Sequence, residues 1–467
     1  MIPKGNLALD SDAEAGTVEL AATPSTKEIR WRVWDLSAPA LVEMMLNSLV
    51  GMADMMMVGR LGSAAIAAVG FTNQPVFFLL AIFRALNVGT TALIARFVGA
   101  RRPDRANDTL RMGFAITLLL GILLSLFSYA TAPMIIAALG AEEEVLPLGI
   151  AYMRLISLGM LFQAGSMALN SALRGAGDTK TPMTTNVTAN IVNVVGNYIL
   201  IYGHFGFPAL GIRGAAMATN IARVLGCSMA LYVVMRKNPI IRLSLAPPYR
   251  LDFGLLQRLI RIGLPAAGEQ LVLRTGQILY LRIVAGLGTA TVAAHQIGMN
   301  ILSLSFMPGQ AFAIAATTLV GQYLGSKRPD TAQKSALETR KLGMIVSCSV
   351  AVLLFFGGAQ IARLYTDEME VIAQTALVLK IIALIQPAQS TQFILAGGLR
   401  GAGDTRWPLV ASFIGIWGVR VAVGYLLVAW FHLGLVGAWT GMALDQCTRS
   451  VLIWTRFKRG RWKSIAV

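Results

Sequence analysis

An internal repeat constrains the fold of this chain more strongly than any other feature of its sequence. The segment 173–179, Leu-Arg-Gly-Ala-Gly-Asp-Thr, recurs unchanged at 399–405, which is 226 residues later. After the fourth long apolar segment the offset falls to 223, which relates Gly214 to Gly437. One offset kept over four apolar segments predicts two copies of one structural unit. The offset of 226 also relates Pro39 to Pro265, Glu43 to Glu269, Gly99 to Gly325 and Arg102 to Arg328.

Long apolar segments identify the repeated unit as a set of membrane helices. Of the 467 residues, 55% are hydrophobic and 13% are charged, against roughly 25% charged in soluble proteins. About 20 apolar residues cross a bilayer as a helix, and the segments lack the alternating pattern of a membrane barrel. Spans are expected near residues 36–58, 64–88, 112–132, 147–170, 184–203, 211–235, 259–284, 292–322, 338–361, 371–395, 408–430 and 433–455.

The net charge of +17 is explained by where the basic residues lie. They occupy the termini and every second loop, as at Arg101 and Arg102, whereas the intervening loops are neutral or acidic, as at 142–144. Positively charged loops stay in the cytoplasm. We therefore expect a multi-pass protein of the inner (plasma) membrane with both termini cytoplasmic, and no nucleic-acid partner.

The domain organisation follows from the repeat and the even number of spans. Each half begins and ends on the same side, so the halves are expected to be parallel repeats around an axis along the membrane normal. The fold class is thus an all-α membrane protein of twelve helices in two six-helix lobes. We expect it to be a monomer. The expected parts are a polar tail at 1–30 without a signal peptide, lobes at 31–235 and 253–457, a cytoplasmic linker at 236–252 and a basic tail at 458–467.

The two lobes differ in the polar groups that they place inside their spans. Asp54 lies deep in the first span, where an ionisable group is by default a functional candidate. The fifth span carries four asparagines on one helical face, at 186, 190, 193 and 197. The second lobe has Tyr280 in place of Asp54, Val419 in place of Asn193, Val423 in place of Asn197 and Ala396 in place of Asn170.

This asymmetric group predicts a cation-binding site. A carboxylate with several carboxamide oxygens suits a hard monovalent cation, or a proton held on the acid. Asp54, Asn193, Asn197 and Asn170 are therefore the expected ligands of a coupling ion, with Na⁺ at Asp54 as the one metal ion considered. No resident cofactor is expected. The alternative is that the asparagines only join helices, at roughly 0.6–2 kcal/mol each, and that Asp54 only caps a helix or forms an ion pair.

The duplicated acids Glu43 and Glu269 have a different interpretation. Because both lobes carry them, they are expected to join neighbouring helices near the cytoplasmic side, with substrate binding as the alternative. Asn190 is a further candidate for the substrate cavity or a conformational role. Asp445 has Arg449 one helical turn later and is expected to pair with it.

Catalytic motifs are missing from the sequence. It contains no Gly-x-Ser-x-Gly, no His-Glu-x-x-His and no phosphate loop of the Gly-x4-Gly-Lys type. The three cysteines and three histidines are scattered and have no metal-ligand spacing. We therefore expect no enzymatic activity, and transport driven by an ion gradient in place of ATP.

Several segments resemble the MATE family of multidrug and toxic compound extrusion transporters. The segment 54–64 is similar to the family's Val-Asp-Thr-x-x-Val-Gly-x-Leu-Gly, and so are the two Leu-Arg-Gly-Ala-Gly-Asp-Thr loops and the Val-Ala-Ala-His-Gln run at 292–296. The resemblance covers nearly all of residues 30–457. It implies a two-lobe fold of twelve helices that exports organic cations or other amphiphilic drugs in exchange for H⁺ or Na⁺.

The resemblance also implies roles for single residues. Asp54 matches the family's amino-lobe cation-binding aspartate, and Asn193 and Asn197 match the polar pair that works with it. Some branches have Asp at the position of Asn197. Pro39 matches the proline at which the first span bends in some members.

Two positions depart from the family pattern. The NorM and eukaryotic branches have a Glu where this chain has Leu273, and their carboxyl-lobe Asp falls at Gln389. A cation site in the second lobe is therefore in doubt, and Gln389 is retained as a candidate for the substrate cavity.

Three other classes of protein remain as alternatives. A flippase for a lipid-linked precursor has the same architecture but needs a strongly basic cavity for pyrophosphate, and arginines within the spans leave that open. A passive channel or a scaffold does not need Asp54, the acid that only the first lobe carries. An intramembrane enzyme is the least supported.

Overall fold

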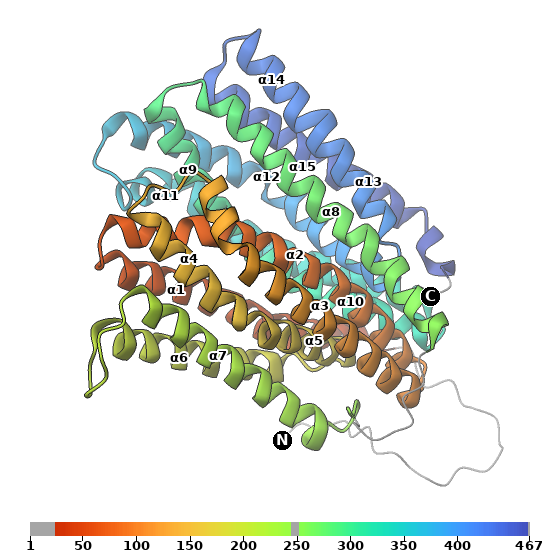
Figure 1. Cartoon of the computed structure of the whole chain (residues 1–467). Coiled ribbons are helices and arrows are strands. Elements are labelled where there is room, and N and C mark those ends of the chain that lie inside the picture. Colours follow the sequence, from red (N-terminus) through yellow and green to blue (C-terminus); the bar gives the residue numbers. More distant parts are fainter. Residues whose placement is uncertain (1–23, 244–251, 466–467) are drawn as a thin grey trace, which may run out of the picture.

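The structure, a computed structural model, describes residues 24–243 and 252–465, and these residues form helices joined by short loops. The helices fall into two groups that lie side by side in Figure 1, from red to yellow-green and from green to blue. The first group contains α1 (Thr26–Gly59), α2 (Ser63–Gly99), α3 (Pro103–Ala138), α4 (Val145–Leu158), α5 (Met160–Ala176), α6 (Lys180–Tyr202), α7 (Ile212–Tyr232) and η1 (Val233–Lys237). The second contains α8 (Phe253–Ala285), α9 (Thr289–Ser305), α10 (Met307–Gly325), α11 (Pro329–Arg363), α12 (Met369–Gly401), α13 (Arg406–Phe413), η2 (Ile414–Val421), α14 (Ala422–Ala429), α15 (Gly434–Lys458) and η3 (Arg461–Ser464).

The expected spans coincide with these helices. By length and composition, eight helical segments of the described residues can cross a membrane, and a ninth if α4 and α5, bent by 43°, form one span. The long helices that this test leaves out are α6, α8 and α15, which carry the asparagine face, Glu269 and Asp445. Each expected span lies within one helix or one consecutive run of helices, or extends beyond it by one residue at an end, which confirms the all-helical membrane fold.

The two groups repeat the same packing. Helix α1 packs on α6, and its counterpart α8 packs on α13. Helix α2 packs on α3 and α5, just as α10 packs on α11 and α12. These groups are the two lobes predicted from the offset.

The lobes meet at the end of the bundle that carries the basic loops, which we call the basic end. There α2 and α10 approach so closely that a Cβ atom at Gly99 would overlap the carbonyl oxygen of Gln322. A Cβ atom at Gly325 would overlap the carbonyl oxygen of Arg96 in the same way. The offset of 226 relates Gly99 to Gly325 and Arg96 to Gln322, so the two contacts are equivalent. The pseudo-twofold axis therefore passes through this crossing.

The repeated Leu-Arg-Gly-Ala-Gly-Asp-Thr loops take part in this contact. Gly177 and Gly403 follow α5 and α12 with φ of 96° and 85°, a backbone region that glycine adopts without steric cost. Across the seam, Gln322 Nε2 donates to the carbonyl oxygen of Gly175 at 3.3 Å. Arg96 Nη1 lies 3.5 Å from the carbonyl oxygen of Ala402. Arg96 and Gln322 are equivalent residues of the two repeats. Each lobe therefore contacts the repeated loop of the other lobe through the same side-chain position.

The described termini lie at the basic end and differ from the expected tails. Helix α1 begins at Thr26, with Ser25 and Glu28 forming a capping box, so residues 26–30 are helical and do not belong to a tail. Trp462 in the basic tail is buried and stacks on Phe457 at 4.8 Å. Residues 1–23 of the tail and 244–251 of the linker lie outside the described part.

The expected pair in the last helix is present and has a third member. Asp445 is fully buried, and its Oδ1 lies 2.7 Å from Arg449 Nε. Arg420, on the π-helix η2, approaches Asp445 Oδ2 to 2.5 Å. Two cations share one carboxylate, so this part of the second lobe carries net positive charge.

Replacement of Gly99 by Ala is predicted to destabilise the protein. The new Cβ would force α2 and α10 apart, which costs about 1–3 kcal/mol, and thermal unfolding in detergent should occur at a lower temperature. Gly325→Ala should behave alike, because it meets the equivalent carbonyl. Gly70→Ala, on the same helix α2 but with no atom within 4 Å of the new Cβ, is the control and should be neutral or slightly stabilising. Equal stability of all three variants would contradict the described packing of the seam.

Candidate ion-binding site

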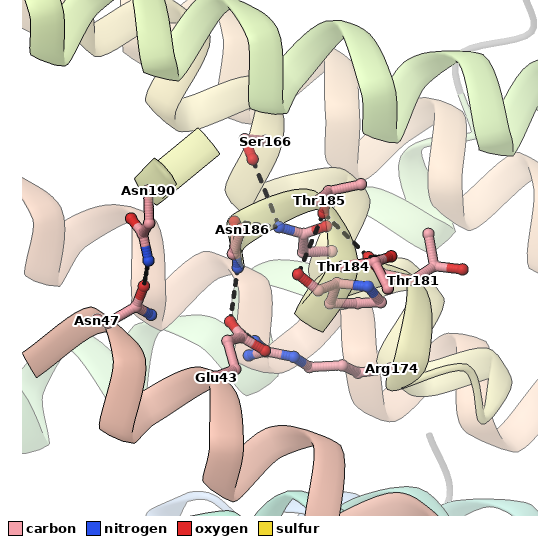
Figure 2. A network of polar contacts seen from close by, with 11 residues as sticks. Glu43, Asn47, Ser166, Arg174, Thr181, Thr184, Thr185, Asn186 and Asn190 are labelled. Carbon is pink, nitrogen blue, oxygen red and sulfur yellow. Dashed lines mark hydrogen bonds and ion pairs between the residues drawn. The ribbon is translucent and has the colours of Figure 1, made fainter. Parts of the chain in front are cut away.

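Helices α1 and α6 run parallel and are joined in register by the asparagine face. Hydrogen bonds at three levels each connect residues that are 143 positions apart, so the two helices keep one register along their length. Figure 2 shows the two of these bonds that lie nearer the basic end. The bonds run from Asn186 Nδ2 to Glu43 Oε1 at 2.6 Å, from Asn190 Nδ2 to Asn47 Oδ1 at 2.5 Å, and from Asn197 Nδ2 to Asp54 Oδ1 at 2.6 Å.

Asp54 is the centre of the group farthest from the basic end. Its carboxylate is half-buried, whereas Asn193 and Asn197 are buried, at 5% and 1% exposed. With its amide turned to satisfy both of its neighbours, Asn193 donates from Nδ2 to the two oxygens of Asp54 at 2.9 and 3.1 Å. In that orientation its oxygen accepts from the Thr219 hydroxyl, on α7, at 3.2 Å.

The arrangement suits an ionised carboxylate that exchanges partners with a cation. Both amides direct N–H groups at Asp54, and hydrogen bonds of this kind stabilise the charged form. The Oδ1 atom of Asn197 is buried and has no hydrogen-bond partner among the described residues. An unused acceptor next to a carboxylate is the combination that a monovalent cation can use. We found no cluster of three His, Cys, Asp or Glu side chains for a resident metal in the described residues.

One residue of this site does not stand out in the sequence. Thr219, on α7, contacts Asn193. Threonine is common in membrane helices, so this position has no pattern of its own. The repeat nevertheless contained a signal, since the second lobe has Met442 in place of Thr219.

The corresponding place in the second lobe has no free carboxylate. Tyr280, which replaces Asp54, is 2% exposed, and its hydroxyl donates to the carbonyl oxygen of Ala438. Val419, which replaces Asn193, lies in η2. The chemical difference between the lobes is therefore also a difference in packing.

Glu43 is the centre of a second group, which both lobes share. Its Oε1 accepts from Arg174 Nη2 at 2.6 Å and from Asn186, as Figure 2 shows. In the second lobe Arg400 Nη2 donates to both oxygens of Glu269 at 2.8 Å. Both arginines belong to the repeated loops. The duplicated acids therefore attach the ends of α5 and α12 to α1 and α8.

The structure places three further predicted residues away from Asp54. Asn170 lies with the Glu43 group, its Nδ2 3.5 Å from Asn186 Oδ1 and 3.4 Å from Ser166 Oγ, and not among the partners of Asp54. Gln389 is 1% exposed inside the second lobe. Pro39 is buried in α1, which continues through it from Thr26 to Gly59.

A family comparison agrees with the repeat. Residues 39–199 and 265–426 each match the family model described as MatE, and the starts of the two matches are separated by the same offset as the repeated loops. The chain belongs to the MATE family of transporters. It is a multi-pass membrane protein and not an enzyme.

Relatives of known name cover nearly the whole chain. The chain is 32% identical over 441 residues to a probable multidrug resistance protein NorM of Thermotoga maritima, covering 94% of each. It is 27% identical over 430 residues to an uncharacterized transporter, YisQ, of Bacillus subtilis, covering 92% of this chain and 94% of that protein.

Solved structures of other transporters have the same fold. One, described as the outward-facing conformation of a multidrug resistance MATE family transporter, superposes with a TM-score of 0.87 at 23% identity, covering 93% of this chain and 97% of the other. Another is a transporter of Pyrococcus furiosus, described as having a binding pocket of reverse polarity, with a TM-score of 0.87 at 23% identity over 95% of this chain and 98% of that chain.

Replacement of either duplicated acid by its amide is predicted to reduce stability. Glu43→Gln and Glu269→Gln each leave an arginine without its carboxylate, and a hydrogen bond to a charged group contributes about 1.5–3 kcal/mol. Thermal unfolding in detergent should therefore occur at lower temperature in both, while Glu142→Gln in an exposed loop should have no effect. If Glu269→Gln keeps full stability but abolishes transport, then Glu269 binds substrate and the structural interpretation is wrong.

Proposed function

We propose that this protein is a secondary active antiporter that exports organic cations and amphiphilic drugs in exchange for H⁺ or Na⁺. It acts as a monomer in the plasma (inner) membrane with both termini in the cytoplasm. The names of its relatives as multidrug resistance proteins support the substrate class. The basic residues at one end of the bundle support the orientation, because positively charged loops stay in the cytoplasm.

The observation that carries the proposal is the Asp54 group. A half-buried carboxylate inside a span is energetically costly and therefore marks a functional site, and only the first lobe has one at this position. Its partners Asn193 and Asn197 can present either N–H or oxygen. The same group of side chains can therefore accommodate a bare carboxylate, a protonated acid or a carboxylate with Na⁺ bound.

Alternating access is supported by where the lobes touch. Hydrogen bonds between the lobes gather at the basic end, for example from Thr318 Oγ1 to the carbonyl oxygen of Arg174 at 2.8 Å. With this end in the cytoplasm, the described conformation is closed inward. The lobes then have to separate at this seam to open the cavity to the cytoplasm.

Ion binding at Asp54 would change the contact between α1 and α6. A proton or Na⁺ on the carboxylate neutralises its charge, so the hydrogen bonds that both amides donate to it become weaker. One of the three hydrogen-bonded contacts between α1 and α6 is then weakened. It also removes the negative charge that attracts a cationic substrate. We propose that α1 then bends at Pro39, that substrate leaves outward, and that the ion leaves to the cytoplasm after the lobes rock.

One observation favours a second candidate function, the transport of an anionic lipid-linked substrate. Arg84 on α2 and Arg274 on α8 are arginines within spans, and neither forms an ion pair with another described residue. Transport of anionic and not of cationic substrates by the purified protein would favour this candidate.

Replacement of Asp54 by Asn is predicted to abolish coupled transport. The variant cannot bind a proton or compensate the charge of Na⁺, so ethidium uptake into proteoliposomes driven by an ion gradient should fall at least tenfold, to background. Its unfolding temperature should remain near that of the wild type, because Asn preserves the shape of the side chain and the neighbouring amides can present either N–H or oxygen to it. Normal transport by Asp54→Asn would refute the proposal.

Two controls identify the coupling ion and the specificity of the effect. Asp367→Asn makes the same chemical change in an exposed loop and should transport normally. Wild-type vesicles with only a pH gradient or only a Na⁺ gradient should show uptake with one of them. Equal uptake without any gradient would instead indicate a passive channel.

A further inference from the structure

A groove opens between α11 and α15 at the basic end of the second lobe, away from the Asp54 group. Its volume is about 410 Å³, within the range of roughly 300–1,000 Å³ found for small-molecule sites. It is lined by Asp330, Gln333, Lys334, Leu337, Glu338, Arg340, Lys341 and Trp454.

Two of the three basic residues that line this groove form no ion pair with its acids. Glu338 is held by Arg30 at 2.7 Å and by Lys341 at 2.8 Å, and Asp330 is paired with Lys463 at 2.9 Å. Lys334 and Arg340 form no ion pair with any described residue. The groove therefore keeps positive charge after its own carboxylates are satisfied.

Arg340 is positioned as if to hold an anion. Its guanidinium lies over the ring of Trp454 at 4.6 Å from the centroid, which fixes the plane of the charged group. Its Nε is buried and has no hydrogen-bond partner among the described residues. A planar guanidinium with free N–H groups is the side chain best suited to phosphate oxygens.

The repeat shows that the groove is not part of the shared scaffold. The first lobe has Phe114 and Ala115 where the second has Arg340 and Lys341. It has an acid, Asp108, in place of Lys334, and Leu231 in place of Trp454. Packing needed by both lobes would be present in both, so these residues serve something that only the second lobe does.

The depth of the groove matches that of lipid headgroups. After Lys341 the next twenty residues of α11, 342–361, contain no Asp, Glu, Lys or Arg, so the helix enters the apolar layer there. Tryptophan is enriched at this boundary. Basic pockets between helices at this level bind anionic headgroups.

We infer that this groove binds the phosphodiester headgroup of an anionic phospholipid, such as phosphatidylglycerol. Arg340 donates to the phosphate oxygens from the face of Trp454, and Lys334 and Lys341 add positive charge at the rim. Glu338 connects the groove to Arg30 on α1 of the other lobe, so the bound lipid lies beside a contact between the lobes. The inference is independent of the chemistry at Asp54.

The test is lipid binding by the purified full-length protein, measured by native mass spectrometry with phosphatidylglycerol and with zwitterionic phosphatidylethanolamine. Arg340→Ala combined with Lys334→Ala should weaken phosphatidylglycerol binding about 30-fold, from ~1 kcal/mol for each basic residue. Phosphatidylethanolamine binding should not change. Arg340→Phe, which introduces the residue of the first lobe, should weaken binding by about fivefold to tenfold.

Three outcomes would overturn the inference. The first is unchanged phosphatidylglycerol binding by the double variant. The second is an equal loss with Arg102→Ala, which removes one positive charge elsewhere at the basic end and should bind normally. The third is binding of free glycerol phosphate as tightly as the lipid, which would assign the groove to a soluble anion.

Discussion

A polar side chain inside a membrane-spanning helix has to find its partner within the protein, and this requirement decides where the helices of this chain meet. The apolar surfaces of the helices have little preference among neighbours, because lipid is as apolar as they are. The bonds from Asn186, Asn190 and Asn197 instead set α6 against α1 in one register. In the second lobe, Asp445 with its two arginines joins α15 to η2 in the same manner.

Some of these contacts are present in both copies of the repeat, and others are present in only one. Where both lobes need the same contact, both copies keep it, as with Glu43 and Arg174 in one lobe and Glu269 and Arg400 in the other. The repeated loops then supply the contact between the lobes, because each presents backbone carbonyls to the partner. A glycine at the crossing is required for the same reason, since a side chain would separate α2 from α10.

Where one lobe has a separate task, the copies diverge in chemistry while the overall arrangement of the helices stays alike. The Asp54 group in the first lobe and the Arg340 groove in the second lie at positions whose counterparts are mostly apolar or oppositely charged. We interpret the first as the place where an ion is exchanged and the second as the place where an anionic lipid is held. A transporter built in this way can change its coupling site without changing the packing that lets its lobes move.

The sequence by itself determined the membrane class, the repeat, the order of the helices and the main candidate, Asp54. These follow from local hydropathy, from spacing along the chain and from one constant offset, all of which are one-dimensional properties. It also placed the asparagines of α6 on one face, because the helical period is known in advance.

Only the tertiary structure decided which of the candidate asparagines contact Asp54. Asn170 has the same chemistry as Asn193, yet it faces Asn186 and Ser166 in place of Asp54. Thr219 enters the site from α7, and Arg420 reaches Asp445 from another helix. Partners on different helices depend on how those helices are rotated and translated against one another, and that is set by the packing of the whole lobe.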